Sequence, residues 1–436
     1  MAAEQSIQLI GGGLIRVTSK EVQGTKDRIT VRVPTLLKDL TVNDQIFIND
    51  GIVELVVEAV EAEDLVCRIV SGGMIASKKG CNIPSTKVHV DIMTEKDRRD
   101  LKFIAELNPE FVAASFVGSG QDIGVIRKIL HEHGNQQIQI VAKIERPLAL
   151  KNIEEIVRSS DVCMIARGDL AVECPTHQVP VAQKNIVRLC NLHARPVIIA
   201  TQMLESMTSS SRPTRAEASD VFKWVPFSSF CLIIAGISAV LDGADAVMLS
   251  GETSVGKYPV ETVRCMAQLA LSAERFAAAR HLDSSNLSAV EPDLDRDDFF
   301  ELNETIGGAI QTLSRHFRQR AIHGKIIVLT ESGFAARMVS KFRPSLPICA
   351  VVTSDRVARE LAIVWGINTV QNNRLTTLFR KQKYELLLKQ LCYQRVVGQH
   401  ETVILVQTVG RHATISVYDV DEIMHESGHN VDNVSE

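Results

Sequence analysis

The sequence lacks the features that mark several common classes of protein. Its formal net charge is only −4 at pH 7, so it has no excess of basic residues of the kind that binds nucleic acid or an anionic membrane. Its nine cysteines are scattered, with no C-x-x-C pair and no spacing typical of metal ligands. We therefore expect most of them to be reduced core residues of a cytoplasmic protein.

Hydrophobic segments long enough to cross a bilayer are also lacking. The longest apolar stretch, Phe227 to Leu241, is too short to span and is interrupted by Ser and Gly. Residues Met1–Gln5 contain an acid and no apolar run follows, so we expect no signal peptide. What remains is an ordinary globular composition, 45% hydrophobic and 23% charged, in a chain of 436 residues that can form two or three domains. We expect no nucleic-acid partner and no membrane partner.

Residues 1–88 have the pattern of a small all-β domain. Short alternating or β-branched runs begin at Ile29, Asp44, Ile52 and Leu65, and Gly or Asn-Asp turns separate them. We expect a small β-barrel module here.

Residues 89–283 alternate between strand and helix patterns, which predicts a parallel sheet. The apolar runs are expected to be strands, and they begin at Phe111, Ile140, Val162, Pro196 and Ala246. Each run ends in polar residues, as the strands of a (β/α)8 barrel do where they build an active site. An open doubly wound sheet is the alternative, but it would concentrate its ligand groups at one switch point.

A polar and acidic stretch, residues 284–298, is expected to be a linker. Residues 299–436 then show a further α/β pattern. Its expected strands begin at Lys325, Pro347 and Thr402.

Two short segments place charge at the ends of apolar runs. Ile140–Glu145 ends with Lys143 and Glu145, which share a face if the segment is a strand. Val162–Asp169 ends with a carboxylate. Two carboxylates beside a lysine are what Mg²⁺-assisted chemistry on a phosphate or an enolate needs, because the acids hold a hard cation and the lysine neutralises developing charge. Taken alone, Lys143 and Glu145 are also compatible with a surface ion pair.

Three turns have sequences that can form anion sites. Gly168 permits close backbone approach, and the N–H groups after it can hold a carboxylate or a phosphate. Thr330–Gly333 follows a strand pattern and precedes a helix pattern, so it is either a phosphate site or a helix N-cap. Gly251–Tyr258 nearly matches a phosphate-binding P-loop, but Tyr258 replaces the Ser or Thr that would hold Mg²⁺, and we do not expect a P-loop.

The chain resembles the pyruvate kinase family. The matching motifs run in order along the chain, and they are Ile48–Gly51, Ser77–Pro84, Ala114–Phe116, Ala142–Glu145, Ala166–Leu170, Ala200–Ser206, Arg212–Glu217, Leu241–Thr253 and Ser340–Pro344. The resemblance implies an α/β fold consisting of a TIM (β/α)8 barrel with an inserted small β-barrel domain and a C-terminal α/β domain. It implies an enzyme of glycolysis that transfers a phosphoryl group from phosphoenolpyruvate to ADP, giving pyruvate and ATP.

The resemblance also assigns roles to residues. Glu145 and Asp169 would ligate Mg²⁺ or Mn²⁺, and Lys143 would stabilise the moving phosphoryl group. Gly168, Asp169 and Thr201 would hold the substrate carboxylate, and Ser115 would be a further substrate-binding residue.

Thr201 would also lie near the site where the enolate is protonated. Lys79 and Asp50, on the β module, would approach the nucleotide, and the module would close as a lid. In the C-terminal domain, Thr330, Ser332 and Gly333 would bind the phosphate of an allosteric effector. The family assembly implied is a homotetramer.

Two departures from the family pattern qualify these expectations. The family begins with three barrel strands before the β module, whereas this chain starts inside that module, so about five of eight strands are expected. The absent part would supply the arginine that grips the substrate phosphate and the ligands of K⁺. A catalytically inactive paralogue, or a truncated product that binds effector or pairs with other subunits, is therefore the alternative, and little activity is expected of the chain as given.

The second departure is an insertion. Residues 222–238, Phe222 to Ser238, stand where the family has two residues. The segment is apolar and contains Pro226, which would break the helix expected there. Translated intron is the favoured interpretation, and a loop or interface element is the alternative.

Overall fold

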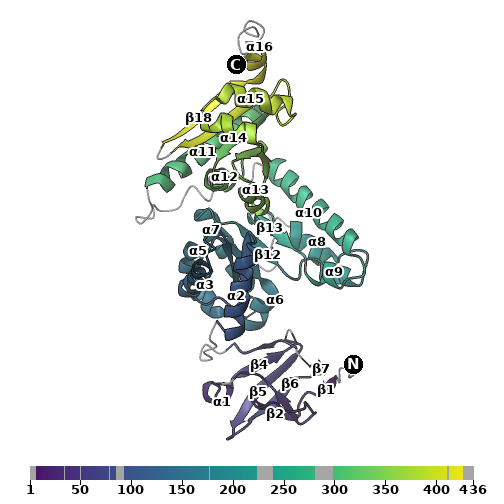
Figure 1. Cartoon of the computed structure of the whole chain (residues 1–436). Coiled ribbons are helices and arrows are strands. Elements are labelled where there is room, and N and C mark those ends of the chain that lie inside the picture. Colours follow the sequence, from purple (N-terminus) through teal and green to yellow (C-terminus); the bar gives the residue numbers. More distant parts are fainter. Residues whose placement is uncertain are drawn as a thin grey trace.

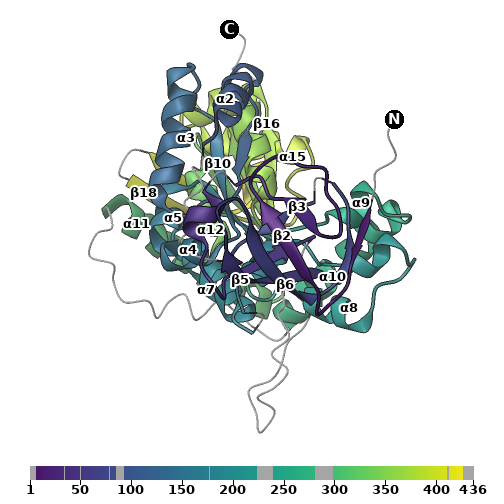
Figure 2. The same ribbon diagram turned by 90° about the horizontal axis from the view of Figure 1, so that it is seen from below.

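The computed structural model describes residues 6–33, 35–49, 51–77, 79–84, 93–175, 177–222, 239–279, 298–409 and 412–425. These form three units that are stacked along one axis, with the N-terminal β unit at one end and the C-terminal unit at the other (Figure 1). Figure 2 shows the molecule from the end occupied by the β unit. No helix among the described residues is both long and apolar enough to cross a membrane.

The N-terminal unit is built from short strands around one apolar core. In the long strand β5 (Val53–Val60), Val53, Leu55 and Val57 are fully buried and alternate with more exposed residues, as expected for a sheet with one covered face. A six-stranded sheet has the order β3-β2-β6-β5-β4-β8, and β1 pairs with β7. The other elements are β1 (Ile7–Leu9), β2 (Leu14–Thr18), β3 (Arg28–Thr30), α1 (Leu36–Asp39), β4 (Gln45–Ile48), β6 (Leu65–Ser71), β7 (Gly73–Ile75) and β8 (Cys81–Asn82).

The central unit holds a five-stranded parallel sheet with the order β13-β12-β11-β10-β9. Each strand pairs with the strand that precedes it in the chain, and the order nowhere reverses, as in half of a (β/α) barrel and unlike a doubly wound sheet. Its strands are β9 (Phe111–Ala114), β10 (Gln139–Ile144), β11 (Val162–Ala166), β12 (Val197–Ala200) and β13 (Ala246–Met248).

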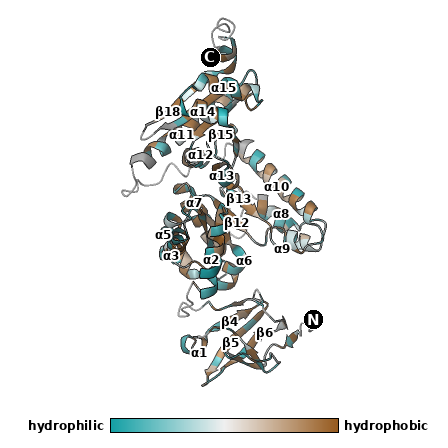
Figure 3. Cartoon of the chain, viewed as in Figure 1, coloured by the Kyte–Doolittle hydropathy of each residue, from teal (hydrophilic) through white to brown (hydrophobic). Residues whose placement is uncertain are grey.

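Helices cover this sheet with their apolar faces. In α3 (Gly120–Glu132), Ile123, Ile126 and Leu130 are buried at helical spacing, and Ser119 and Asp122 form a capping box at its start. Figure 3 shows the corresponding hydrophilic colour on α2, which lies on the outside. The remaining helices are α2 (Glu95–Leu107), α4 (Pro147–Lys151), α5 (Ile153–Ser159), α6 (Arg167–Glu173), α7 (Val179–Leu192), η1 (Glu205–Thr208), α8 (Arg215–Phe222), α9 (Gly251–Ser254) and α10 (Pro259–Ala279).

The C-terminal unit is a sheet covered on both faces. Its order is β16-β15-β14-β17-β18, and only β18 is antiparallel to its neighbour. Alternate residues of β14 (Gly324–Thr330) enter two separate cores, which explains its continuous apolar sequence. The other elements are α11 (Asp298–Gln319), α12 (Phe334–Ser340), β15 (Ile348–Val352), α13 (Asp355–Glu360), η3 (Leu361–Ile363), β16 (Ile367–Gln371), α14 (Asn373–Arg380), α15 (Tyr384–Tyr393), β17 (Thr402–Val409), β18 (His412–Asp419) and α16 (Val420–His425).

The two edges of the central sheet face different units. At the amino ends of the strands, Arg359 bonds to Glu110 at 2.7 Å and Glu360 accepts from Gln139 at 2.9 Å, which joins this edge to the C-terminal unit. At the carboxyl ends, Asn82 of the β unit donates to Glu173 of α6 at 3.1 Å. The carboxyl ends of the strands therefore face the β unit.

Three of the sequence predictions concern residues that lie wholly or mostly outside the described part of the chain. The boundary expected at residue 88 lies outside them, and so does the expected linker except for Asp298, which begins α11. Of the insertion expected at 222–238, only Phe222 is described, as the last residue of α8.

Candidate active site

Polar residues follow neighbouring strands of the central sheet, at the points where the strands end. Ser115 follows β9, Glu145 follows β10, Arg167 follows β11 and Thr201 follows β12. The parallel pairing places these positions side by side along one edge of the sheet. The strand ends predicted from the sequence are thus brought together.

Lys143 and Glu145 interact directly at the end of β10. The Lys143 ammonium lies 2.6 Å from Oε1 of Glu145 and donates to the Ser115 hydroxyl at 2.8 Å. The Glu145 side chain is only 1% exposed, and its Oε2 accepts the N–H of Phe116 at 2.6 Å. A buried carboxylate needs such partners, and both of its oxygens have one. The ammonium therefore lies over the sheet edge, between two strand ends.

Gly168 and Thr201 meet across the next two strands. The Gly168 N–H donates to Oγ1 of Thr201 at 2.7 Å, and this hydroxyl donates to the carbonyl of Ala200 at 2.7 Å. A side chain at residue 168 would bring a Cβ within 3.3 Å of the Thr201 hydroxyl, so glycine allows the close approach. The pair forms a small polar nest at the start of α6.

Acidic groups gather around the same helix. Asp169 lies in the first turn of α6, where the helix dipole favours a negative charge, and Glu173 lies one turn further on. Burial raises the pKa of Glu173, the hydrogen bond from Asn82 and the charge of Arg146 oppose this, and the charges of Asp169 and Glu145 raise the pKa further. Asp169, in the first turn of α6, and Glu145, at the end of β10, are thus both close enough to Glu173 to raise its pKa.

The acids fit a cation that takes only part of its coordination from protein. Among the described residues there is no group of three or more His, Cys, Asp and Glu side chains arranged to hold a metal ion. Mg²⁺ is commonly bound by one or two carboxylates with substrate oxygens and water completing its shell. Glu145 and Asp169 fit that donor set.

The expected nucleotide side is only partly described. Lys79 is exposed in the segment before β8, and Asp50 lies outside the described residues. The described contact between the β unit and the site is the hydrogen bond between Asn82 and Glu173, both of which are buried. Sequence reasoning missed this pair, because no local pattern links positions 91 residues apart.

Two further charged residues follow strands of the central sheet, Arg167 after β11 and Glu252 after β13. Arg167 is 5% exposed and Glu252 is fully buried. Both bind the turn that follows β12, Arg167 through the carbonyls of Thr201 and Gln202 and Glu252 through the N–H of Leu204. Their position after apolar strands was the available signal, and their full burial was not foreseeable from it.

The segment that resembles a P-loop has a different structure. Residues 251–254 form α9, and the Glu252 side chain is buried beneath it, accepting the N–H groups of Leu204 and Ser250. The Gly256 N–H bonds back to the carbonyl of Gly251 at 2.9 Å. The backbone donors are turned inward, so the segment offers no phosphate cradle.

The expected effector residues form a compact turn before α12. Thr330 is 5% exposed and its hydroxyl accepts the N–H of Gly333 at 3.0 Å, while the Ser332 hydroxyl accepts the N–H of Phe334 at 3.5 Å. Gly333 has φ +77°, which favours glycine. These bonds shape the turn but are not a side-chain N-cap, because the N-cap residue of α12 is Gly333, and a phosphate role stays a prediction.

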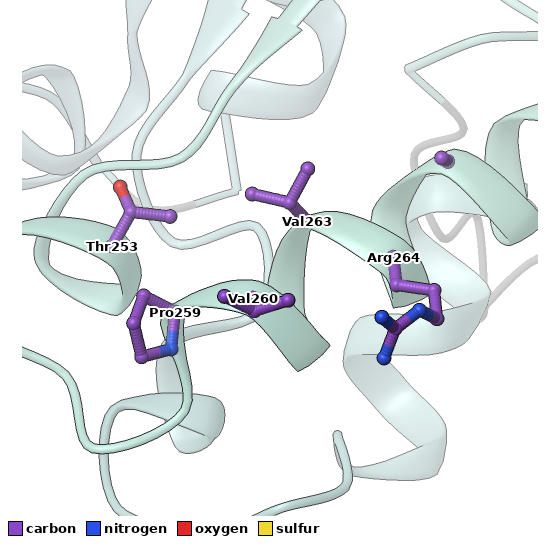
Figure 4. Close-up of a pocket in the computed structure, with 6 residues that line it drawn as sticks. Thr253, Pro259, Val260, Val263 and Arg264 are labelled. Carbon is purple, nitrogen blue, oxygen red and sulfur yellow. The ribbon is translucent and has the colours of Figure 1, made fainter.

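A separate hollow of about 500 Å³ lies on the surface of α9 and α10 (Figure 4). Its walls are mainly apolar, formed by Thr253, Pro259, Val260, Val263, Arg264 and Ala267. It contains none of the strand-end residues described above. We therefore place the candidate site at the strand ends, where the charged and hydroxyl groups converge.

Comparisons with known proteins agree with this arrangement. Residues 1–263 match the family described as pyruvate kinase, barrel domain, and residues 309–418 match the one described as pyruvate kinase, alpha/beta domain. The chain is 40% identical to a pyruvate kinase of Geobacillus stearothermophilus over 374 residues, 85% of this chain and 59% of the relative. It is 36% identical to a pyruvate kinase of Mycobacterium tuberculosis, over 88% of this chain and 75% of the relative.

A solved structure is also similar. A crystal structure of a pyruvate kinase from Cryptosporidium parvum matches with a TM-score of 0.81 at 30% identity, covering 96% of this chain and 81% of that one. The chain spans about three fifths of the length of the Geobacillus stearothermophilus relative. The order of the strand-end groups and these matches lead to one conclusion: the chain belongs to the pyruvate kinase family.

Proposed function

We propose that this chain performs the pyruvate kinase reaction, in which a phosphoryl group passes from phosphoenolpyruvate to ADP and gives pyruvate and ATP in glycolysis. The observation that carries the proposal is the cluster at the strand ends. Lys143 lies against Glu145 and Ser115, and the Gly168–Thr201 nest lies on the next two strands. This supplies a fixed positive charge for a phosphoryl group beside hydrogen-bonding groups for a carboxylate.

Each strand-end residue then has a task. Lys143, oriented by Ser115 and Glu145, stabilises charge on the moving phosphoryl group. The substrate carboxylate takes the backbone N–H groups at Gly168 and Asp169, displacing the Thr201 hydroxyl from Gly168. That hydroxyl then faces the substrate and lies near the carbon that is protonated when the enolate becomes pyruvate.

Glu145 and Asp169 would hold Mg²⁺ or Mn²⁺. Such an ion neutralises phosphate charge and aligns the reacting oxygens. The proposal extends to K⁺ as the monovalent cation of the family, with its ligands outside this chain.

The arrangement of the units supports separate roles for the central sheet and the β unit. We infer that the central sheet is part of a TIM barrel of about five strands, in residues 89–283, and that residues 1–88 are a small β-barrel domain inserted as a lid. The support is the separate apolar core of the β unit and its contact with α6 through Asn82. Lys79 and Asp50 would approach the nucleotide from that lid, whose closure excludes water.

Residues 299–436 would form the C-terminal domain, joined by the linker 284–298. This domain would take a phosphorylated small-molecule effector at Thr330, Ser332 and Gly333. A cytoplasmic homotetramer completes the proposal, and it would work without nucleic acid or membrane.

The Lys143→Met variant tests the reaction. We expect purified chain to form pyruvate from phosphoenolpyruvate and ADP slowly, because the family's substrate-phosphate arginine is not among its residues, and only with Mg²⁺ or Mn²⁺ present, in an assay coupled to NADH oxidation. Loss of the Lys143 charge should lower kcat by about 10²-fold or more, since it removes a preorganised charge from the transition state.

Ser115→Ala is the matched control. It removes one partner of the ammonium and keeps the charge, so a loss of only about fivefold to tenfold is expected. Metal-dependent turnover that survives in Lys143→Met would contradict the assignment of the site. A folded wild-type chain without turnover would instead favour an inactive, effector-binding or subunit-pairing role.

A further inference from the structure

The turn after β12 has an unfavourable backbone. Thr201 has φ +66° and Gln202 has φ +52°, so two successive residues other than glycine occupy the left-handed region. This region is costly for side chains in general and most costly for β-branched residues such as threonine. Such a conformation persists only where surrounding contacts determine it.

Arg167 contacts this turn from α6. Its guanidinium donates to the carbonyl of Thr201 at 3.0 Å and to that of Gln202 at 3.1 Å, so one planar group binds both left-handed residues. The same side chain pairs with Asp220 at 2.7 Å. Because the guanidinium is almost wholly buried, solvent does not compete for these bonds.

Glu252 contacts the turn from the opposite side. Its Oε1 accepts the Leu204 N–H at 3.0 Å and its Oε2 accepts the Ser250 N–H at 2.7 Å. The carboxylate is fully buried, and its hydrogen bonds tie the end of the turn to the end of β13. Residues 201–204 are thus held between a buried cation and a buried anion.

The held turn directs a hydroxyl at the nest. With the backbone fixed, Oγ1 of Thr201 lies 2.7 Å from the Gly168 N–H, the donor assigned above to the substrate carboxylate. Arg167 also directly precedes Gly168 on α6, so it connects the two members of the nest, Gly168 and Thr201.

We propose that Arg167 and Glu252 are positioning residues that hold the Thr201 hydroxyl in the geometry for the substrate carboxylate and for protonation of the enolate. The functional part of this inference rests on the proposed function. The geometric part, a turn held by two buried charges, does not.

The variants Arg167→Lys and Glu252→Gln test the inference. Lysine keeps the charge but has no planar fork to bind the turn carbonyls with one nitrogen and Asp220 with another, and glutamine keeps the size but presents an N–H to one of the two backbone donors. Each should bind pyruvate about tenfold or more weakly in the presence of Mn²⁺. Mn²⁺ affinity, measured by electron paramagnetic resonance, should change by less than about twofold, because Glu145 and Asp169 are retained.

Arg343→Lys is the matched control for lost stability. Arg343 also bonds a backbone carbonyl, that of Gly243 at 2.6 Å, and also pairs with an aspartate, Asp245, but at the amino end of the sheet. It should lower Tm while leaving pyruvate affinity within about twofold. Equal losses of pyruvate and Mn²⁺ affinity in the Arg167 and Glu252 variants would overturn the proposal, and so would unchanged pyruvate affinity in both.

Amide hydrogen exchange measures how firmly the turn is held, independently of pyruvate binding. Exchange of the amides at residues 202–204 should be about tenfold faster in both variants than in wild type, and unaffected in Arg343→Lys. If wild-type chain fails to bind pyruvate, the proposed function fails, and hydrogen exchange alone then tests the role of Arg167 and Glu252 in holding the turn. Unchanged exchange in both variants would then refute it.

Discussion

At the scale of single residues, the site depends on charges that have been removed from water. Glu145 and Glu252 are both buried, and each oxygen of each carboxylate has a donor within hydrogen-bonding distance, a backbone N–H or the Lys143 ammonium. Glu173 differs, because the hydrogen bond from the neutral amide of Asn82 and the charge of Arg146 do not offset its burial and the charges of two other acids, so its pKa is raised. It is therefore the weakly compensated member of the acidic group, and it carries a testable pH dependence.

The Glu173→Gln variant should be more stable than wild type at pH 8 and equal to it near pH 4. Burial raises the pKa of Glu173, so its favourable contribution is present when it is protonated and is lost as pH rises through its pKa in the folded state. Glutamine stays neutral and keeps an oxygen for Asn82. The gain at pH 8 should be on the order of 1 kcal/mol.

Thermal unfolding at both pH values, with EDTA present, measures this difference. Glu154→Gln is the control, since Glu154 forms an exposed pair with Arg158 and should give no such pH-dependent gain. A loss of stability at pH 8 in Glu173→Gln would show that the charged form is favoured.

At the scale of elements, a backbone hydrogen bond links the end of α8 to the residue that follows the insertion, with the geometry of a continuous helix. The N–H of Ala239 bonds to the carbonyl of Asp220 at 3.2 Å, and both Val221 and Ala239 are fully buried in the same core. If two residues stood between Val221 and Ala239, Ala239 would be the fourth residue after Asp220. The observed bond is then the ordinary i to i−4 bond of an α-helix. Val221 and Ala239 are therefore placed as they would be in one continuous helix with only two residues between them.

Replacing residues 222–238 with two alanines should preserve the fold. Alanine favours helix, and the flanking contacts already have helical geometry. We expect Tm to be equal to or higher than that of the original chain, with unchanged helix content by circular dichroism. Replacement by Gly-Pro is the control and should lower stability by about 3 kcal/mol, since proline interrupts a helix. Failure of the Ala-Ala variant to fold would show that the segment contributes to the structure.

At the scale of the whole molecule, buried charges join the central and C-terminal units. Asp245 precedes β13, has a side chain that is only 6% exposed, and accepts from the backbone N–H groups of Val197 and Trp365 while pairing with Arg343 at 3.2 Å. The Arg343 guanidinium also lies 4.9 Å from the centre of the Trp365 ring. These contacts lie at the amino edge of the sheet, opposite the site, so the unit that carries the expected effector turn is fixed to the scaffold of the strands and not to the reacting groups.

The Arg343→Met variant should weaken this attachment. It leaves Asp245 buried without its cation, and removal of one partner of a buried pair costs about 3 kcal/mol. Guanidinium chloride unfolding, followed by tryptophan fluorescence, should show an earlier transition in which the C-terminal unit separates. Lys96→Met, which removes an exposed pair with Asp100, should change the free energy of unfolding by less than about 0.5 kcal/mol. Equal effects of the two substitutions would contradict a stabilising role for Arg343.

The sequence predicted the fold where local spacing carries the information. Continuous apolar runs predicted the five central strands, because both faces of a parallel sheet are covered. Several strands were missed, β2, β16 and β18 among them, since their sequences lack a continuous or alternating apolar run strong enough to stand out without the pairing partner.

The sequence by itself determined which side chains stand at the strand ends, because a residue that follows an apolar run must emerge where the strand leaves the core. Lys143, Glu145 and Thr201 were found in this way. Only the tertiary structure decided what holds them, because Arg167 and Glu252 reach the Thr201 turn across 34 and 48 residues, and Asn82 reaches Glu173 across 91. Contacts of that length leave no periodic trace in a sequence, since they arise only when the packed strands bring the groups together.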